Sequence, residues 1–145
     1  YVSAMTRLLA LDVGDERIGV AISDDLGLLA RPLTVLQRVA GPESFLRLAG
    51  IIEREGVSRI IVGLPLLPDG TEGKQVRSTQ AYVRGLTSYV DVPIIYWDER
   101  YTTQEARVLT SMADSRRKRG PVDIDAVAAA VILQDYISEQ TEDAD

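Results

Sequence analysis

Five short apolar runs, each bounded by polar or glycine- and proline-containing turns, set the pattern of the chain. They cover residues 7–13, 18–23, 33–36, 59–64 and 93–97. Runs of this length that are rich in Ile, Val and Leu predict buried β-strands. The polar turn at residues 14–17 joins the first two runs, which therefore predict a β-hairpin.

Longer segments between and after these runs carry apolar residues at helical spacing. The first begins at Pro42-Glu43, with a proline and an acid at its start, and it ends at Gly56. Thr102 and the residues up to 105 resemble a helix cap. The other predicted helices cover residues 74–89, 106–112 and 121–138.

The order of these elements predicts an α/β fold with a mixed five-stranded sheet. A three-strand meander comes first, and two right-handed crossovers then place the later strands parallel beside the first one. The predicted strand order is 3-2-1-4-5, with the second strand antiparallel and helices on both faces. We expect a single domain over residues 5–138, preceded by a cloning remnant at 1–4 and followed by a flexible acidic tail at 139–145.

The composition removes several classes of chemistry. The chain of 145 residues contains no Cys and no His, which excludes disulfides, the usual zinc sites, a Ser-His-Asp triad and a thiol nucleophile. Acid–base or metal chemistry must therefore use carboxylates and other oxygen groups, and carboxylates favour Mg²⁺ or Mn²⁺. No apolar run approaches the length of a membrane span, so we expect a cytoplasmic protein with no membrane partner.

The net charge of −6 is unevenly distributed. Four acids lie after Ser138, so the rest of the chain carries only −2. That part also contains a basic run, Arg116, Arg117, Lys118 and Arg119. A nearly neutral body with a local positive cluster is compatible with a nucleic-acid partner, although such runs are also common on solvated surfaces.

Acidic residues interrupt apolar segments at places that the predicted topology brings to one edge of the sheet. Asp12 ends the first strand, and Asp98 and Glu99 follow the fifth. Asp125 lies on the apolar stripe of the last helix. Carboxylates gathered from separate elements repel one another unless a cation lies between them. With Mg²⁺ or Mn²⁺ bound, they could activate water for phosphodiester hydrolysis.

Structural explanations also exist for these acids. Asp12 could hold the following turn through local hydrogen bonds, and Asp98 and Glu99 could pair with Arg100 or cap the next helix. The first turn of a helix favours an acid such as Asp123. Residues 11–14 also resemble the phosphate-binding hairpin of actin-like and sugar-kinase-like ATPases, but those enzymes need two such domains and this length supplies one.

Four blocks, in order and at matching spacing, resemble the YqgF/RuvX family: residues 9–24, 59–73, 98–107 and 122–136. The resemblance covers almost the whole chain. It implies an RNase H-like fold and a metal-dependent nuclease, first proposed to resolve Holliday junctions and usually described as maturing the 5′ end of 16S ribosomal RNA. The catalytic residues that it implies are Asp12, Asp98 or Glu99, and Asp125, with Asp12, Glu99 and Asp125 as metal ligands.

One departure concerns the fourth strand, where RNase H-like nucleases carry an acid and this chain has Gly63. The third carboxylate must then come from the fifth strand, roughly 9.5 Å from Asp12. Alternation along a strand places Asp98 and Glu99 on opposite faces, so only one of them is expected to reach the metal. We favour Glu99, which has the longer side chain.

Basic and aromatic residues near this edge are candidates for nucleic-acid contacts. The basic candidates are Arg17, Lys74, Arg77, Arg100, Arg116, Arg117, Lys118 and Arg119. Trp97 is expected to pack in the core, whereas Tyr101 is the better candidate for base stacking. The polar loop at 65–73 could also touch substrate.

The sequence leaves more than one function open. The first hypothesis is an endonuclease that acts on structured RNA, with precursor 16S rRNA as substrate and an association with the ribosome. The second keeps the chemistry but cleaves four-way DNA junctions as a homodimer, because such cleavage makes two symmetric cuts. The third is a non-catalytic nucleic-acid- or ribosome-binding module. The chain itself is compatible with a monomer or a homodimer.

Overall fold

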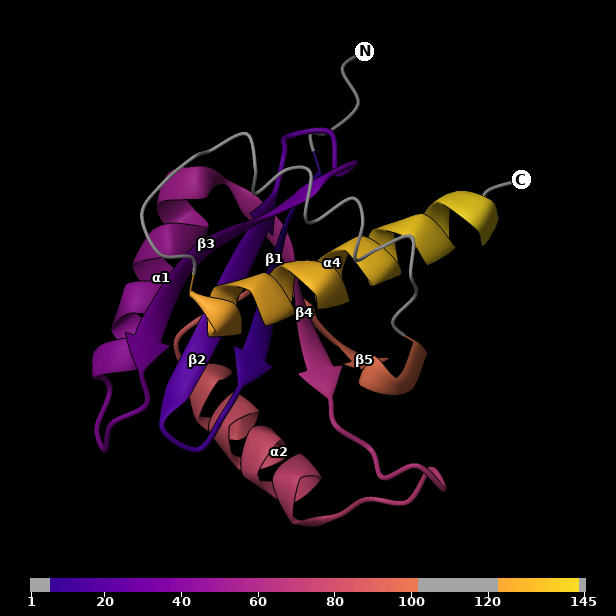
Figure 1. Cartoon of the computed structure of the whole chain (residues 1–145). Helices are drawn as coiled ribbons and strands as arrows, with labels where there is room; N and C mark the ends of the chain where they lie inside the picture. Colours follow the sequence, from indigo (N-terminus) through magenta and orange to yellow (C-terminus); the bar gives the residue numbers. More distant parts are fainter. Residues whose placement is uncertain (1–5, 102–122, 144–145) are drawn as a thin grey trace.

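The computed structural model describes residues 6–101 and 123–143. Its centre is a five-stranded sheet with the order β3-β2-β1-β4-β5. The strands are β1 (Arg7–Val13), β2 (Arg17–Ser23), β3 (Ala30–Gln37), β4 (Val57–Leu64) and β5 (Ile94–Asp98). β2 is antiparallel to β1 and β3, whereas β1, β4 and β5 run parallel. The predicted strand order and directions are therefore confirmed (Figure 1).

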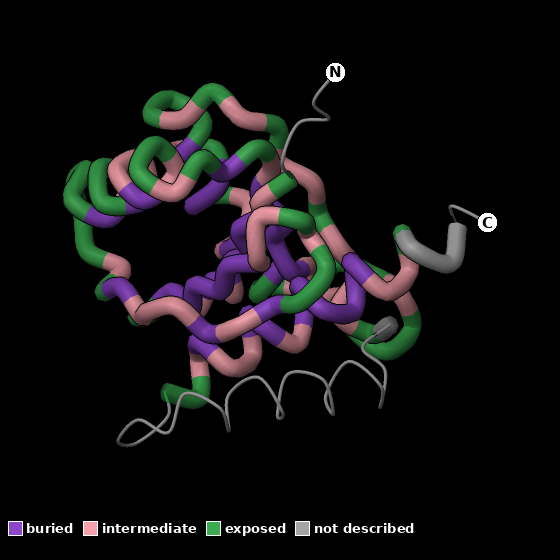
Figure 2. The backbone as a smooth tube through the Cα atoms, turned by 90° about the horizontal axis from the view of Figure 1, so that it is seen from above, coloured by how far each residue is buried: buried purple, intermediate pink, exposed green. Residues whose placement is uncertain are grey.

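Helices cover both faces of this sheet. α1 (Glu43–Glu55) and α2 (Lys74–Leu86) lie on one face, and α4 (Ile124–Asp143) lies across the other (Figure 1). A short 3-10 helix, η1 (Glu99–Tyr101), follows β5 directly. Buried residues gather in the middle of the molecule, between the helical layers (Figure 2). Within the described ranges, no helix has the length and apolar character needed to cross a bilayer.

Alternation along β1 supplies both halves of the core. Leu9, Leu11 and Val13 pack with residues of α1 and α2. Leu8 and Ala10 pack against α4. Asp12 follows Leu8 and Ala10 at the same spacing of two residues, so its side chain lies on the α4 face, near the carboxyl end of the strand. Burial of the apolar residues thus fixes the side of the sheet on which this charged group lies.

Several element ends differ from those predicted. β3 begins at residue 30 rather than 33, because it pairs with β2 along its whole length. Pro32 is tolerated there since β3 is an edge strand with a register irregularity beside this proline. β4 begins at Val57 rather than 59, and α2 ends at Leu86 rather than 89. Pairing with a distant strand, which local sequence does not reveal, decides the extent of β3.

The last helix also differs from its predicted span of 121–138. α4 begins at Ile124 and continues to Asp143, so most of the segment predicted as an acidic tail at 139–145 is helical. Acids in the final turns oppose the helix dipole. Buried Leu133, Tyr136 and Ile137 nevertheless hold the preceding turns against the sheet.

Some predicted features lie outside the described residues. They are the remnant at 1–4, the helix at 106–112 with its cap at 102–105, and the basic run at 116–119. The structure also does not describe the side chain of Tyr101, the candidate for base stacking.

Gly19 allows α4 to approach the sheet more closely than a side chain would permit. It is the cross-strand partner of Asp12 in the pairing of β1 with β2. A Cβ atom on Gly19 would collide with the backbone carbonyl of Asp125, at the start of α4. The missing side chain therefore brings the first turn of α4, and with it Asp125, against β2 next to Asp12.

We expect Gly19→Ala to destabilise the fold, because the added methyl group must displace the start of α4. The expected loss is about 1–3 kcal/mol of unfolding free energy, measured by urea denaturation. Gly50→Ala is the matched control, since Gly50 lies inside α1 and an added Cβ would meet nothing within 4 Å. That variant should gain about 0.5–1 kcal/mol. Equal effects of the two substitutions would contradict the role of this contact.

Candidate active site

Three acidic side chains from separate elements lie at the carboxyl ends of the parallel strands. Asp12 is near the end of β1, Glu99 follows β5 directly, and Asp125 is in the first turn of α4. The negative charge of Asp125 acts on Asp12, and that of Asp12 acts on Glu99. The fold thus brings acids that are far apart in the sequence to one edge of the sheet.

Asp12 is the central member of this group. Its side chain is half-buried, and burial raises its pKa above the ordinary value for an aspartate. The nearby charge of Asp125 raises this pKa further. On the other side of the hairpin lies Gly19, over which α4 passes. A carboxylate that is partly desolvated beside a second carboxylate is strongly stabilised by a cation.

Glu99 reaches the same region from the end of β5. Its carboxylate lies over Gly63 of β4, because a Cβ atom on Gly63 would come within 2.8 Å of Glu99 Oε2. Burial raises the pKa of Glu99 to about 7, and the charges of Asp12 and Asp98 add to the rise. Gly63, at the position where the family resemblance led us to expect an acid, therefore provides the space that the Glu99 side chain occupies.

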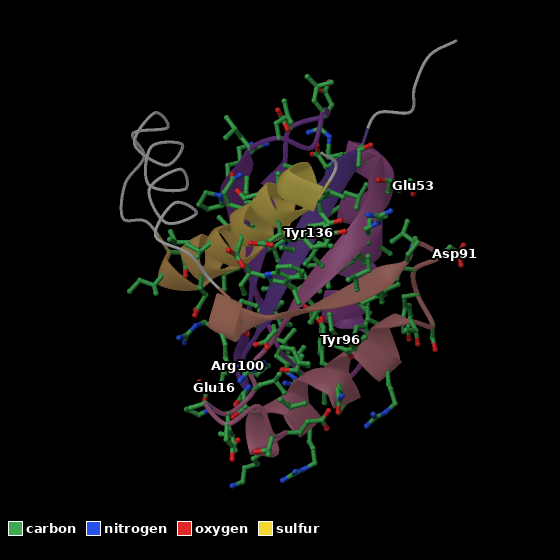
Figure 3. The ribbon with its side chains drawn as sticks, turned by 90° about the vertical axis from the view of Figure 1, so that its right-hand side faces the viewer. Glu16, Glu53, Asp91, Tyr96, Arg100 and Tyr136 are labelled. Atoms are coloured by element: carbon green, nitrogen blue, oxygen red, sulfur yellow. The ribbon has the colours of Figure 1, made fainter. Side chains whose placement is uncertain are left out.

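Asp98 is engaged by Arg100. It accepts hydrogen bonds from the Arg100 guanidinium at 2.8–3.1 Å and from the Arg100 backbone N–H at 2.9 Å. This pairing holds the pKa of Asp98 below its ordinary value. Arg100 also donates to the carbonyl of Pro68 at 3.2 Å, and it lies at the end of the molecule opposite Asp91 (Figure 3). The ion pair with Arg100, which was the structural explanation for Asp98, is therefore confirmed.

Asp125 is also paired with a cation of this chain. Arg17 Nε donates to Asp125 Oδ2 at 2.7 Å, and the two side chains are 54% and 31% exposed. The pair therefore lies at the rim of the site rather than inside it. Asp123 Oδ1 accepts a hydrogen bond from the Asp125 backbone N–H at 3.0 Å, which satisfies an otherwise free amide at the start of α4. Asp123 thus has the structural role expected for it.

The predicted nucleic-acid contacts divide into two kinds. Arg17 is ion-paired with Asp125, and Arg100 is ion-paired with Asp98 beside the site. Lys74 and Arg77 are exposed in the first turn of α2, and neither forms an ion pair with another described residue. The remaining four, at 116–119, lie outside the described ranges.

Sequence reasoning missed a set of polar contacts behind the site. Arg38, which follows β3, donates to the carbonyl of Gly14 at 3.0 Å and to Ser78 Oγ at 2.9 Å. Ser78 Oγ in turn donates to Asp15 at 2.9 Å. These bonds tie the turn between β1 and β2 to α2. No local signal identifies Arg38, because its partners lie 24 and 40 residues away in the sequence.

The donor set of this edge suits a divalent metal ion. Asp12 and Glu99 are half-buried carboxylates whose pKa values are raised partly by neighbouring negative charge, and a cation between them would remove that repulsion. Among the residues that the structure describes, no three acidic side chains form a group that could hold one ion. The structure therefore brings Asp12 near each of the other two acids without assembling all three around one point.

Comparison with known proteins identifies the family. The family model described as "RuvX: Holliday junction resolvase" matches residues 6–139. The chain belongs to the RuvX family. The resemblance drawn from the four sequence blocks, and with it the assignment to a nuclease family, is confirmed.

Relatives and solved structures agree with this assignment. A protein of Thermoanaerobacter pseudethanolicus named "Putative pre-16S rRNA nuclease" is 48% identical over 136 residues, covering 92% of this chain and 97% of the relative. A protein of the same name from Desulforamulus reducens is 46% identical over 132 residues, 90% of this chain and 96% of that one. Thermus thermophilus RuvC superposes with a TM-score of 0.65 at 12% identity, covering 94% of this chain and 97% of RuvC. The predicted RNase H-like fold of this RuvX-family protein is thus confirmed.

Glu99→Gln should change stability in a pH-dependent way when a chelator removes metal ions. Because the folded-state pKa of Glu99 is raised from 4.5 to about 7, ionisation of this group destabilises the wild-type fold progressively across that range. Gln cannot ionise. The variant should therefore match the wild type below about pH 4.5 and exceed its unfolding free energy by about 1–2 kcal/mol above about pH 7, allowing for solvent access.

Urea denaturation at the two ends of this pH range measures the difference. Glu16→Gln is the control, since Glu16 is an exposed glutamate outside this group. A gain for Glu99→Gln that is the same at both pH values would contradict the assigned cause.

Proposed function

We propose that this RuvX-family chain is a divalent-metal-dependent endonuclease that hydrolyses phosphodiester bonds in structured nucleic acid, and that it processes the 5′ end of precursor 16S rRNA. The proposal is carried by the position of Asp12 between Asp125 and Glu99 at the carboxyl edge of a RuvC-like sheet. The printed names of similar proteins, which specify a pre-16S rRNA nuclease, favour this substrate.

Asp12, with Glu99 on one side and Asp125 on the other, would supply the metal ligands, and Mg²⁺ or Mn²⁺ suits these oxygen donors. Because the three acids do not surround one point, Asp12 would share an ion with one of its two neighbours at a time. When bound, such an ion supplies an activated water and stabilises charge on the phosphodiester oxygens. The Arg17 guanidinium orients Asp125 through the 2.7 Å contact. Without a metal ion the pKa of Glu99 is raised to about 7, so binding of the cation near neutral pH would release a proton from this carboxyl group.

The exposed cations beside this edge support contact with a nucleic-acid backbone. Lys74 and Arg77 project from the first turn of α2, which follows β4 at the end of the sheet where the acids lie. Neither is neutralised by a described acid. Both are therefore available to bind phosphate, and contacts of this kind position a substrate without reading its sequence.

The family description favours a second candidate, cleavage of four-way DNA junctions. A resolvase makes two symmetric cuts, so this function requires a homodimer. The rRNA-processing function has no such requirement and is compatible with a monomer that binds the ribosome. Solution mass measured with and without junction DNA therefore separates the two.

We expect Asp12→Asn to lower metal-dependent cleavage by at least about 10³-fold while leaving the fold intact. The substitution removes the negative charge of the carboxylate that lies between Glu99 and Asp125. Cleavage is measured on precursor 16S rRNA and, in parallel, on a four-way DNA junction. Asp91→Asn, at the opposite end of the molecule, is the matched control (Figure 3). Robust cleavage by Asp12→Asn at saturating Mg²⁺ would refute the proposal. Salt-dependent binding without turnover by the wild type would indicate a non-catalytic module instead.

Glu99→Gln and Asp98→Asn should differ sharply in activity. Glu99 faces Asp12, so its loss should reduce the cleavage rate by about 10²-fold or more. Both carboxylate oxygens of Asp98 accept hydrogen bonds from the Arg100 guanidinium. Asp98→Asn should therefore change the cleavage rate by less than about tenfold. Single-turnover rates at saturating metal measure both. A larger loss of cleavage rate for Asp98→Asn than for Glu99→Gln would indicate that Asp98, rather than Glu99, acts in the active site.

A further inference from the structure

Asp135 of α4 is a buried acid that the site described above does not use. It is 0% exposed. Its Oδ2 accepts a hydrogen bond from the indole Nε1 of Trp97 at 2.8 Å. Its Oδ1 is also buried and has no hydrogen-bond partner. A buried acceptor without a partner weakens a fold, so this carboxylate destabilises the fold through one oxygen while the other oxygen satisfies the Trp97 N–H.

The bond from Trp97 to Asp135 fixes the orientation of a large side chain. Trp97 is partly buried and packs against the core on the α4 face of the sheet, in agreement with the packing role predicted for it. Its ring meets the ring of Tyr136 edge-on, with centroids 5.3 Å apart and an interplanar angle of 89°. The Tyr136 hydroxyl accepts a hydrogen bond from Arg59 Nη1 of β4 at 3.0 Å. Trp97 is thus held both by a directional hydrogen bond and by a ring whose own position is fixed.

Trp97 is close to Glu99 in sequence and is paired with Gly63 in the sheet. It is two residues before Glu99, and its partner in the β4–β5 pairing is Gly63. The Glu99 carboxylate occupies the space over this same glycine. A rotation of the Trp97 end of β5 would therefore move Glu99 relative to Gly63 and to Asp12.

We propose that Asp135 is a positioning residue whose hydrogen bond to Trp97 holds the end of β5 so that Glu99 stays over Gly63, within reach of Asp12. α4 then serves the site twice: its first turn carries Asp125, and ten residues later it holds the strand that presents Glu99. The inference rests on the proposed nuclease function, since a positioning role is expressed in the rate of the reaction.

Gln134 provides a matched control on the same helix. It is adjacent to Asp135 and 2% exposed. Its side chain accepts from the Ala30 backbone N–H at 2.8 Å and donates to the Leu28 carbonyl at 3.2 Å. These partners lie at the β3 side of the sheet, across from β5. Gln134→Leu therefore removes buried polar contacts of α4 without touching the Trp97 end of β5.

The test compares Asp135→Leu, Trp97→Phe and Gln134→Leu in the full chain with Mg²⁺, on whichever substrate the wild type cleaves. The first two should lower kcat by about 10- to 100-fold with KM changed by less than about twofold, because a small displacement of Glu99 affects the reaction more than substrate binding. Gln134→Leu should lower thermal stability with kcat within about twofold of wild type. Asp135→Asn, which retains an oxygen acceptor for Trp97, should restore kcat to within about threefold.

Fluorescence gives a readout that is independent of cleavage. Trp97 is the only Trp of the chain, so the emission spectrum reports the surroundings of this one indole, which include its bond to Asp135. Emission should shift in Asp135→Leu and remain unchanged in Gln134→Leu. If the wild type cleaves and Asp135→Leu behaves like Gln134→Leu in kcat, the positioning role is overturned. If Asp135→Leu does not fold, Trp97→Phe with wild-type kcat overturns it equally. Absence of cleavage by the wild type would instead count against the proposed function.

Discussion

The close contact between the start of α4 and β2 governs the acidic edge of this protein. It exists because position 19 has no side chain, so the Asp125 backbone can lie where a Cβ atom would otherwise be. Gly19 is paired with Asp12 across the hairpin, so the helix brings its own acid beside the acid of β1. A larger residue at this position would lift the helix and separate the two charges.

Once the acids are close, electrostatics shapes the rest of the site. Asp12 and Glu99 lose solvent and face negative neighbours, and both pKa values rise. Asp98 and Asp125 each have an arginine of this chain, Arg100 and Arg17 respectively. The charge of Asp125 acting on Asp12, and the charges of Asp12 and Asp98 acting on Glu99, leave a local excess of negative charge at these two carboxyl groups. Such an excess is the condition under which a divalent cation binds well to oxygen donors.

The fold and part of the site were predictable because strong local signals agreed with one another. The strands were visible as apolar runs, and connection rules fixed their order and directions. Asp12 and Asp125 stood out because each interrupts an apolar pattern. The choice between Asp98 and Glu99 could be argued only from alternation and reach. The structure adds the bonds that Arg100 makes to Asp98 and the space that Gly63 leaves for Glu99.

The sequence by itself determined the order of the sheet, the family and the end of the sheet where the acids gather. These depend on local features of the sequence: the period of the hydrophobic residues, the turn residues and the spacing of the motifs. Tertiary structure alone decided the length of β3, the role of Arg38 and the contact between Trp97 and Asp135. Each of these depends on partners that are distant along the chain, and the identity of a partner is set by packing in three dimensions rather than by the residues on either side.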